Sequence, residues 1–216
     1  KYNLEKDLLI VIPVHNEFTN IKKLYFSLKK KKYKILFVDD CSIDKTEKFF
    51  KKNKISFIKN NKNYGYEKTL LRGFGYALNK KYKFIISMDG DGEHDVNDIK
   101  KFISHYKKNK SDIIIGNRSF KPRFMEHVTA AYFNLKYNIS DPFSGFILYK
   151  TEIFKNVKLS KFNDSYLVDL LKFFVMKKKR VSKININIKK RIDKPRVGNN
   201  FFVNIKMIKI FFRVLF

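Results

Sequence analysis

The sequence has one cysteine, few acidic residues and no long apolar run, and each shortage excludes a class of protein. A single thiol, Cys41, forms no disulfide within the chain and cannot supply the several thiolates of a structural zinc site. This usage fits a cytosolic setting. No stretch of about 18 uninterrupted apolar residues marks a membrane span, and the first residues show no basic-then-apolar signal pattern.

Acidic residues are outnumbered, since 48 Lys and Arg stand against 20 Asp and Glu and give a formal net charge of +28. Such an excess favours anionic partners: nucleic acid, nucleotide phosphates or an acidic membrane surface. Nucleic acid is disfavoured, because the 23 phenylalanines fall at apolar helix and strand positions and do not alternate with basic residues on an exposed sheet face. A general lysine-rich bias with solvated surfaces is the alternative explanation of the charge.

Short apolar runs alternate with helical periodicity along a chain of 216 residues, a length that fits one domain with a sizeable core. The runs that predict strands lie at residues 8–14, 33–38, 55–58, 82–88 and 112–116. Helical spacing fills the intervals, as at 45–53 and 67–78. After residue 118 we expect a long connection with one helix, a helix near 167–174 and a strand at 181–188. This alternation predicts an α/β fold with a mostly parallel sheet covered by helices on both faces.

The strand at 82–88 breaks abruptly into acids and glycines. Asp89 and Asp91 alternate with glycine, so a tight turn can aim both carboxylates at one point, where they would repel each other without a cation. A hard divalent ion, Mg²⁺ or Mn²⁺, is the natural partner for such oxygen ligands. The alternative is a solvated acidic turn that stabilises the N-terminus of the helix after Asp95. The nearby His94 is expected at the surface.

Other polar residues fall where the remaining predicted strands end. They are His15 after the first strand, Asp39 and Asp40 after the second, and Arg118 after the fifth. In parallel sheets, ligands bind beyond the carboxyl ends of the strands. The sequence therefore predicts one site at this shared edge, together with Asp89.

The motifs at this edge together resemble those of the family-2 glycosyltransferases, and within them the polyprenyl-phosphate sugar transferases of the dolichyl-phosphate mannose synthase type. The matching segments lie at residues 11–17, 38–46, 63–65, 88–91, 116–118 and 141–146. The resemblance implies the GT-A nucleotide-diphospho-sugar transferase fold. It implies a catalytic domain over 1–200, with a donor half of about 1–118 and an acceptor half of about 119–200. An amphipathic C-terminal helix at 201–216 would follow.

The resemblance also implies a donor site for a nucleoside-diphosphate sugar. Asp89 and Asp91, with Glu93, would hold the metal on the donor diphosphate, and Asp40 would accept a hydrogen bond from the base. The other donor-binding residues implied are Pro13, His15, Glu17, Asp39, Lys68, Arg191 and Arg196. The open alternatives are helix capping around residues 39–44 and a solvated basic loop around residues 189–199. The sequence departs from the family in carrying His15 for a Tyr, Tyr66-Glu67-Lys68 for a Lys followed by small residues, and Pro195 for a Ser.

The reaction implied is metal-dependent transfer of the sugar to a polyprenyl phosphate. Arg118 and Arg123 would bind the acceptor phosphate, which is already ionised near neutral pH and needs no general base. The rival acceptor is a glycan hydroxyl, which does need a base because an alcohol is barely ionised at pH 7. Asp141 or Asp169 would then serve. Asp169 is either such a catalytic residue or an acid on a helix surface.

The last sixteen residues, 201–216, predict an interfacial helix. Lys206, Lys209 and Arg213 recur at spacings of three and four, and nearly all the others are large and apolar. A helix of this length spans about 24 Å, short of the roughly 30 Å hydrocarbon core of a bilayer. We expect it on the cytoplasmic face of an anionic membrane, peripheral or anchored by sequence beyond residue 216. The alternatives are a helix packed on the sheet and the start of a truncated membrane span.

Overall fold

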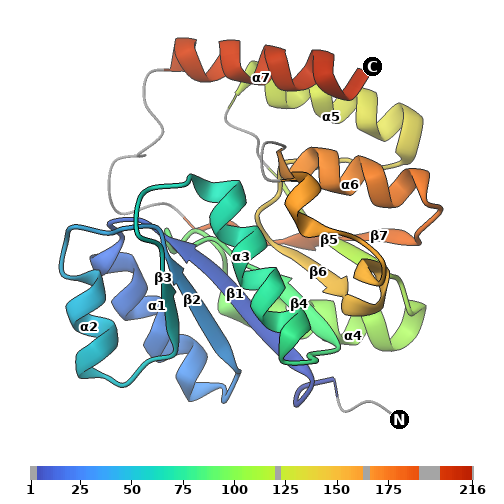
Figure 1. The fold of residues 1–216 in the computed structure, drawn as a ribbon. Helices are drawn as coiled ribbons and strands as arrows, with labels where there is room; N and C mark the ends of the chain where they lie inside the picture. Colours follow the sequence, from blue (N-terminus) through green and yellow to red (C-terminus); the bar gives the residue numbers. More distant parts are fainter. Residues whose placement is uncertain (1–3, 120–122, 163–165, 190–199, 216) are drawn as a thin grey trace.

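The computed structural model describes residues 4–119, 123–162, 166–189 and 200–215 and is organised around a seven-stranded sheet of order β3-β2-β1-β4-β6-β5-β7 (Figure 1). Neighbouring strands are parallel except β6, which runs antiparallel to both β4 and β5. The strands are β1 (Leu8–Val14), β2 (Ile35–Asp39), β3 (Phe57–Lys59), β4 (Phe84–Ser87), β5 (Ile113–Arg118), β6 (Ile147–Lys150) and β7 (Val181–Ile186). The mostly parallel sheet expected from the sequence is confirmed.

Helices cover both faces of this sheet, as the alternating pattern predicted (Figure 1). The helices are α1 (Phe18–Lys30), α2 (Thr46–Lys52), α3 (Tyr66–Asn79), α4 (Ile99–Asn109), α5 (Phe124–Tyr137), α6 (Leu167–Met176) and α7 (Asn200–Leu215). Short 3₁₀ helices lie at η1 (Val96–Asp98), η2 (Thr151–Phe154) and η3 (Leu159–Phe162). The ends of the elements differ from the predicted ones by one to three residues in most cases, as expected of boundaries read from periodicity.

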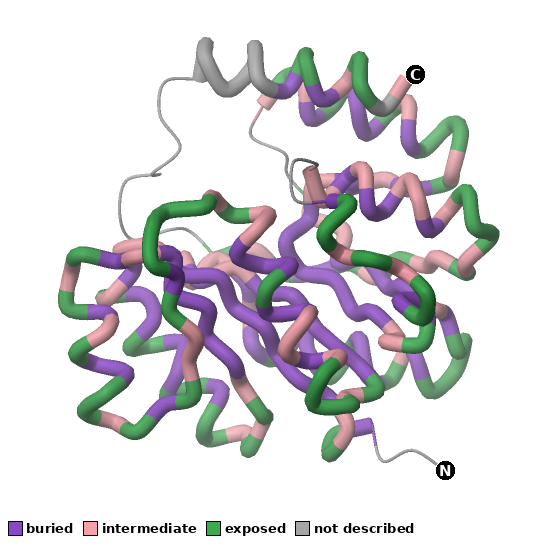
Figure 2. Tube along the Cα trace, viewed as in Figure 1, coloured by how far each residue is buried: buried purple, intermediate pink, exposed green. Residues whose placement is uncertain are grey.

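Strand β1 shows why the central strands are apolar throughout. All seven of its residues are buried (Figure 2). Successive side chains of a strand point to opposite faces, so Ile10 and Ile12 join the core under α1, α2 and α4, whereas Leu9 and Val11 join the core under α3, α5 and α6. The sheet is thus packed between two cores, and this packing fixes the positions of the carboxyl ends of β1, β2 and β4.

Helix α7 packs on helices α5 and α6, away from the sheet (Figure 1). Met207 and Ile210 are buried, and the Phe211 ring lies 5.9 Å from that of Tyr132 on α5. Phe212 remains 55% exposed. Within the described ranges, the structure contains no helix that combines the length and apolarity needed to cross a membrane.

Candidate active site

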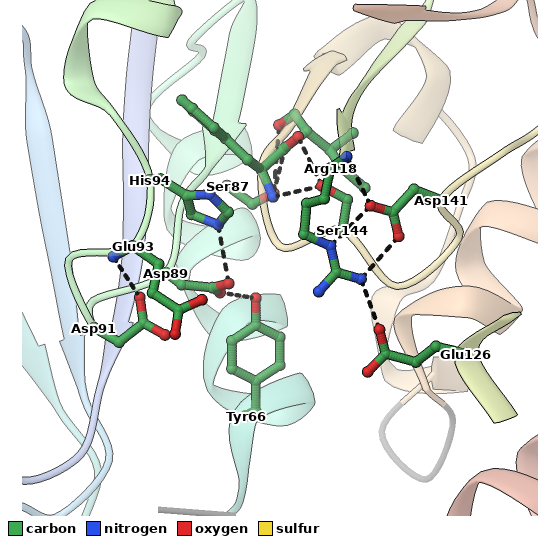
Figure 3. A network of polar contacts seen from close by, with 12 residues as sticks. Tyr66, Ser87, Asp89, Asp91, Glu93, His94, Arg118, Glu126, Asp141 and Ser144 are labelled. Carbon is green, nitrogen blue, oxygen red and sulfur yellow. Dashed lines mark hydrogen bonds and ion pairs between the residues drawn. The ribbon is translucent and has the colours of Figure 1, made fainter. Parts of the chain in front are cut away.

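Asp89 lies just past β4 and is held from three sides (Figure 3). The Tyr66 hydroxyl, at the start of α3, donates to Asp89 Oδ1 at 2.6 Å, and His94 Nε2 lies 3.1 Å from Oδ2. Gly145, just before β6, packs so closely that a Cβ there would be 2.2 Å from Oδ2. Burial and the negative Asp89 raise the pKa of Tyr66 well above its usual value, so its hydroxyl stays a donor. The Asp89 carboxylate is therefore fixed in orientation.

The surroundings of Asp91 stabilise its negative charge less than those of Asp89 do. Its Oδ1 accepts the backbone N–H of Glu93 at 3.0 Å. Burial, and then repulsion from Asp89, raise its pKa from 3.8 to about 6. Burial pushes the pKa of Asp89 up as well, but hydrogen bonds from His94 and Tyr66 and the charge of Arg118 hold it below its usual value. The fold thus brings two carboxylates together without cancelling their mutual repulsion.

This pair fits a divalent cation of the kind that binds with a diphosphate. Mg²⁺ and Mn²⁺ are commonly held by one or two carboxylates, with substrate phosphates and water completing the shell. The described residues contain no group of three or more acidic, histidine or cysteine side chains placed to hold a metal. The expected trio of Asp89, Asp91 and Glu93 is not among such groups, and the contact seen between Glu93 and Asp91 is made by the Glu93 backbone N–H. A donor diphosphate would have to supply the remaining ligands.

The expectation that His94 lies at the surface is wrong. Its relative exposure is 4%, and its ring packs 4.8 Å from that of Phe146. A backbone bridge to Ile188 holds the segment in place, and the only polar partner its Nε2 meets in Figure 3 is Asp89. An acidic, glycine-rich sequence suggested a solvated loop, but the loop packs against Phe146 and Ile188, and the imidazole is buried.

Arg118 ends β5 and binds two buried carboxylates (Figure 3). Its Nε and Nη2 donate to Asp141 Oδ2 and Oδ1 at 2.8 and 2.9 Å, and Nη2 also reaches Glu126 Oε2 at 3.1 Å. Arg123 Nη1 donates to Glu126 Oε1 at 2.7 Å. Although burial opposes its charge, Asp141 and Glu126 raise the pKa of Arg118, so it stays a cation.

Two features of this cluster bear on the sequence-based predictions. Asp141, expected as a possible base, is 1% exposed and has both oxygens on Arg118, whose backbone N–H also donates to Oδ2 at 3.1 Å. Glu126, also 1% exposed, was not singled out from the sequence. Its position three residues after Arg123, in the first turn of a helix, was the available signal.

The predicted nucleoside-binding residues gather at the carboxyl ends of β1 and β2. Asp40, 4% exposed, accepts hydrogen bonds from Asn60 Nδ2 at 2.7 Å and from the backbone N–H groups of Tyr64 and Gly65 at 2.9 Å each. It therefore holds the loop that leads into α3. His15 Nδ1 lies 2.8 Å from the Asp40 carbonyl oxygen.

The neighbouring acids have structural partners too. Asp39 is fully buried, and its Oδ1 accepts the Ser42 N–H at 3.0 Å, while its Oδ2 has no hydrogen-bond partner within the part of the chain described. Glu17 accepts a hydrogen bond from Asn20 at 2.8 Å. The Pro13 carbonyl lies 3.0 Å from where a Cβ on Gly90 would stand, so β1 directly abuts the acidic turn. Base binding by these residues stays a prediction.

The remaining predicted site residues lie outside the network in Figure 3. Lys68 lines a cavity of about 520 Å³ that adjoins Asp40, because two of its lining residues, Asn60 and Tyr64, are hydrogen-bond partners of Asp40. The other lining residues are Lys59, Asn61 and Arg72. Asp169 Oδ2 accepts the Tyr166 N–H at 2.9 Å and pairs with Arg213 Nε at 3.3 Å, contacts expected of an acid at a helix start. Arg191 and Arg196 lie outside the described residues.

The chain belongs to glycosyl transferase family 2, which matches residues 9–158. An uncharacterized protein of Methanocaldococcus jannaschii is 33% identical over 182 residues, covering 75% of this chain and 78% of its own. A dolichol-phosphate mannosyltransferase of Pyrococcus furiosus is 28% identical over 184 residues, covering 75% of this chain and 51% of its own.

A solved structure shows the same fold. Glucosyl-3-phosphoglycerate synthase from Mycobacterium tuberculosis, in complex with Mn²⁺, uridine diphosphate and glucosyl-3-phosphoglycerate, superposes with a TM-score of 0.72 at 12% identity. The match covers 98% of this chain and 81% of that one. The fold is therefore GT-A, as expected, and the chain is a family 2 glycosyltransferase that takes its sugar from a nucleotide sugar.

Proposed function

We propose that this enzyme transfers a sugar from a nucleoside-diphosphate sugar to the phosphate of a polyprenyl lipid at a membrane surface, with a divalent cation. One observation carries the choice of acceptor: Asp141 has both carboxylate oxygens bound by Arg118. A hydroxyl acceptor needs a base, and an acid paired in this way is a poor one because protonating it would break the ion pair. A phosphate acceptor needs cations and no base.

On the donor side, the proposal uses the carboxylate pair. Asp91, with Asp89 oriented by Tyr66 and His94, would hold Mg²⁺ or Mn²⁺ against the donor diphosphate. When bound, the cation would supply charge stabilisation for the departing nucleoside diphosphate. Arg191 and Arg196 are expected to add guanidinium donors to that group. The nucleoside would lie toward β1 and β2, near His15.

On the acceptor side, Arg118 and Arg123 would hold the lipid phosphate. Arg118 stays charged at any physiological pH because two buried carboxylates surround it. The charge of Arg118 also contributes to lowering the Asp89 pKa, so Arg118 lies within electrostatic range of that carboxylate. Nucleophile and leaving group would thus meet between β4 and β5.

The membrane part of the proposal rests on helices α5, α6 and α7. Large apolar side chains stand exposed on each of them, and basic residues accompany them. The exposed apolar residues are Phe124 and Leu135 on α5, Met176 on α6, and Ile208 and Phe212 on α7. Apolar side chains with basic neighbours suit an anionic lipid surface. The name of the Pyrococcus relative, a dolichol-phosphate mannosyltransferase, supports the same class of acceptor.

The acceptor is tested by product formation from a panel of nucleotide sugars with Mn²⁺. We expect transfer to a short polyprenyl phosphate and none to the matching polyprenol or to an oligosaccharide. Transfer to the oligosaccharide alone would replace the proposed acceptor with the glycan rival.

Membrane binding is tested separately by flotation with anionic liposomes at low salt. Phe212→Asp should leave much more protein unbound, because a charge would enter the interface. Ile43→Asp is the matched control, since Ile43 is 89% exposed in the segment after β2, remote from α7 (Figure 1). If both variants float with the liposomes as well as the parent does, the hypothesis that α7 binds the membrane interface is wrong.

A further inference from the structure

We infer that Glu126 is a positioning residue for the acceptor phosphate, because it holds Arg118 and Arg123 side by side. The inference rests on the proposed function and adds to it a residue that neither the sequence motifs nor the comparisons assign. Glu126 lies in the first turn of α5, and Figure 3 shows its carboxylate directed at the Arg118 guanidinium.

The two arginines come from different parts of the fold. Arg118 is the last residue of β5, whereas Arg123 directly precedes α5. Glu126 binds both, with Oε2 3.1 Å from Arg118 Nη2 and Oε1 2.7 Å from Arg123 Nη1. One carboxylate therefore sets the spacing and the relative orientation of two guanidinium groups that the backbone alone leaves independent.

The burial of Glu126 makes this arrangement rigid. Its side chain is 2% exposed, against 16% for Arg118 and 24% for Arg123. A buried carboxylate is tolerated only when it is paired and hydrogen-bonded, so the glutamate cannot turn away to solvent without losing both partners. The arginines, in contrast, are partly exposed.

The cluster of Arg118, Arg123, Asp141 and Glu126 has little net charge, but it contains hydrogen-bond donors that its own carboxylates do not use. The Arg123 side chain is 24% exposed and uses Nη1 on Glu126, which leaves Nη2 outside this bond. Arg118 uses Nε and Nη2 on Asp141 and Glu126, which leaves Nη1 outside these bonds. Two guanidinium groups face two carboxylates, so their formal charges cancel. A phosphate would then be recognised by the direction of the free donors, which Glu126 fixes, more than by overall attraction.

The opposite role for Glu126 predicts the opposite result. If Glu126 merely occupied the arginines as a counter-ion, a phosphate would have to displace it, and removing its charge would strengthen phosphate binding. If Glu126 positions the arginines, removing its charge weakens binding, because Arg123 loses the partner that places it beside Arg118. The sign of the change therefore separates the two roles.

The experiment is a calorimetric titration of the Mn²⁺-loaded full chain with farnesyl phosphate in the absence of donor. Glu126→Gln keeps the shape of the side chain and removes its charge. We expect about tenfold weaker binding, within the range seen when the partner of a ligating group is lost. Affinity for uridine or guanosine diphosphate should stay unchanged, as should kcat at saturating acceptor.

Glu47→Gln is the matched control, because Glu47 on α2 also bridges two cations, Lys51 on α2 and Lys59 on β3. Strand β3 is one edge of the sheet, and β5, which carries Arg118, lies near the opposite edge. The farnesyl phosphate affinity of Glu47→Gln should equal that of the parent. In an Arg123→Ala background, Glu126→Gln should have a much smaller effect, because the group it positions is gone. Should the glutamine variant fail to fold, Glu126→Asp, which keeps the charge but is too short to reach both arginines, should show the same selective loss.

Unchanged or tighter farnesyl phosphate binding by a folded Glu126→Gln, with the parent binding normally, overturns the inference and leaves the proposed acceptor in place. No binding of farnesyl phosphate by the parent overturns the lipid-phosphate acceptor and the inference together. A selective loss in the variant, absent from Glu47→Gln, supports it.

Discussion

We assign one half of the site to the donor and the other to the acceptor, and the two halves handle charge in opposite ways. In the donor half, Asp89 and Asp91 are brought together, and burial, followed by repulsion from Asp89, raises the pKa of Asp91 to about 6. In the acceptor half, Arg118 and Arg123 are matched by Asp141 and Glu126, and both of these acids are buried.

The difference shows which half depends on a partner from outside. Two neighbouring carboxylates that repel each other favour a bound cation, so we expect a metal with its diphosphate to complete the donor half. A neutral cluster is complete in itself, and it gains selectivity from geometry rather than from excess charge. We expect substitutions in the first half to affect metal and donor, and those in the second to affect the acceptor.

The largest effect should come from removing the negative charge of Asp91, which the divalent cation is expected to neutralise. Asp91→Asn should lower turnover about a hundredfold or more, as loss of a key charge-stabilising group does, with little change in Tm. Asp95→Asn, in the same acidic stretch but capping η1, should keep nearly full activity. Full activity of the parent protein in excess chelator would contradict the metal hypothesis, and with it the contrast between the donor and acceptor halves.

The next effect tests whether Asp89 must be held in place. Gly145→Ala puts a Cβ 2.2 Å from Asp89 Oδ2, so the carboxylate must shift, and we expect a loss of kcat/KM of roughly 10- to 100-fold. Gly75→Ala is the control, because among the described residues no atom beyond its chain neighbours and its own helix backbone lies within 4 Å of the added Cβ. Alanine also favours the interior of α3. Steady-state kinetics of the two variants would show equal values if the orientation of Asp89 did not matter.

A smaller effect is expected at the nucleoside end of the donor half. Asp40→Ala leaves Asn60 and two backbone N–H groups without their acceptor, so it should cost about 1–3 kcal/mol of stability. The sequence-based hypothesis gives Asp40 a hydrogen bond to the base, so nucleotide binding should weaken as well. Denaturant melts and calorimetry with a nucleoside diphosphate measure the two effects. Unchanged nucleotide affinity would move the base pocket away from Asp40.

The smallest effect is a pH dependence of the carboxylate pair. Because the Asp91 pKa is raised from 3.8 to about 6, Asp91 in the unliganded protein carries a proton that the unfolded chain has lost between those values. Its contribution to stability therefore falls as pH rises through this window, while Mn²⁺ affinity rises. In Asp89→Asn, carboxyl NMR titration should give an Asp91 pKa closer to 3.8. An unshifted pKa would show that Asp89 is not the cause.

Much of the site could be predicted from the sequence, because its residues follow apolar runs. The periodicity of β1, β2, β4 and β5 is local, and parallel strands necessarily end at one edge, so Asp39, Asp40, Asp89 and Arg118 could be placed together before any contact was known. The acidic turn also indicated its own chemistry, since two neighbouring carboxylates repel wherever they lie.

Tertiary structure alone decided which partner each side chain meets. Tyr66 reaches Asp89 from 23 residues away, and Arg118 reaches Asp141 across the same separation, through loops whose conformations no local pattern specifies. The burial of His94 and Glu126 and the reversed direction of β6 arose in the same way. Periodicity reports only which face of an element is apolar. The pairing of charges depends on how the loops close, and the low dielectric of the folded interior then makes each pairing strong.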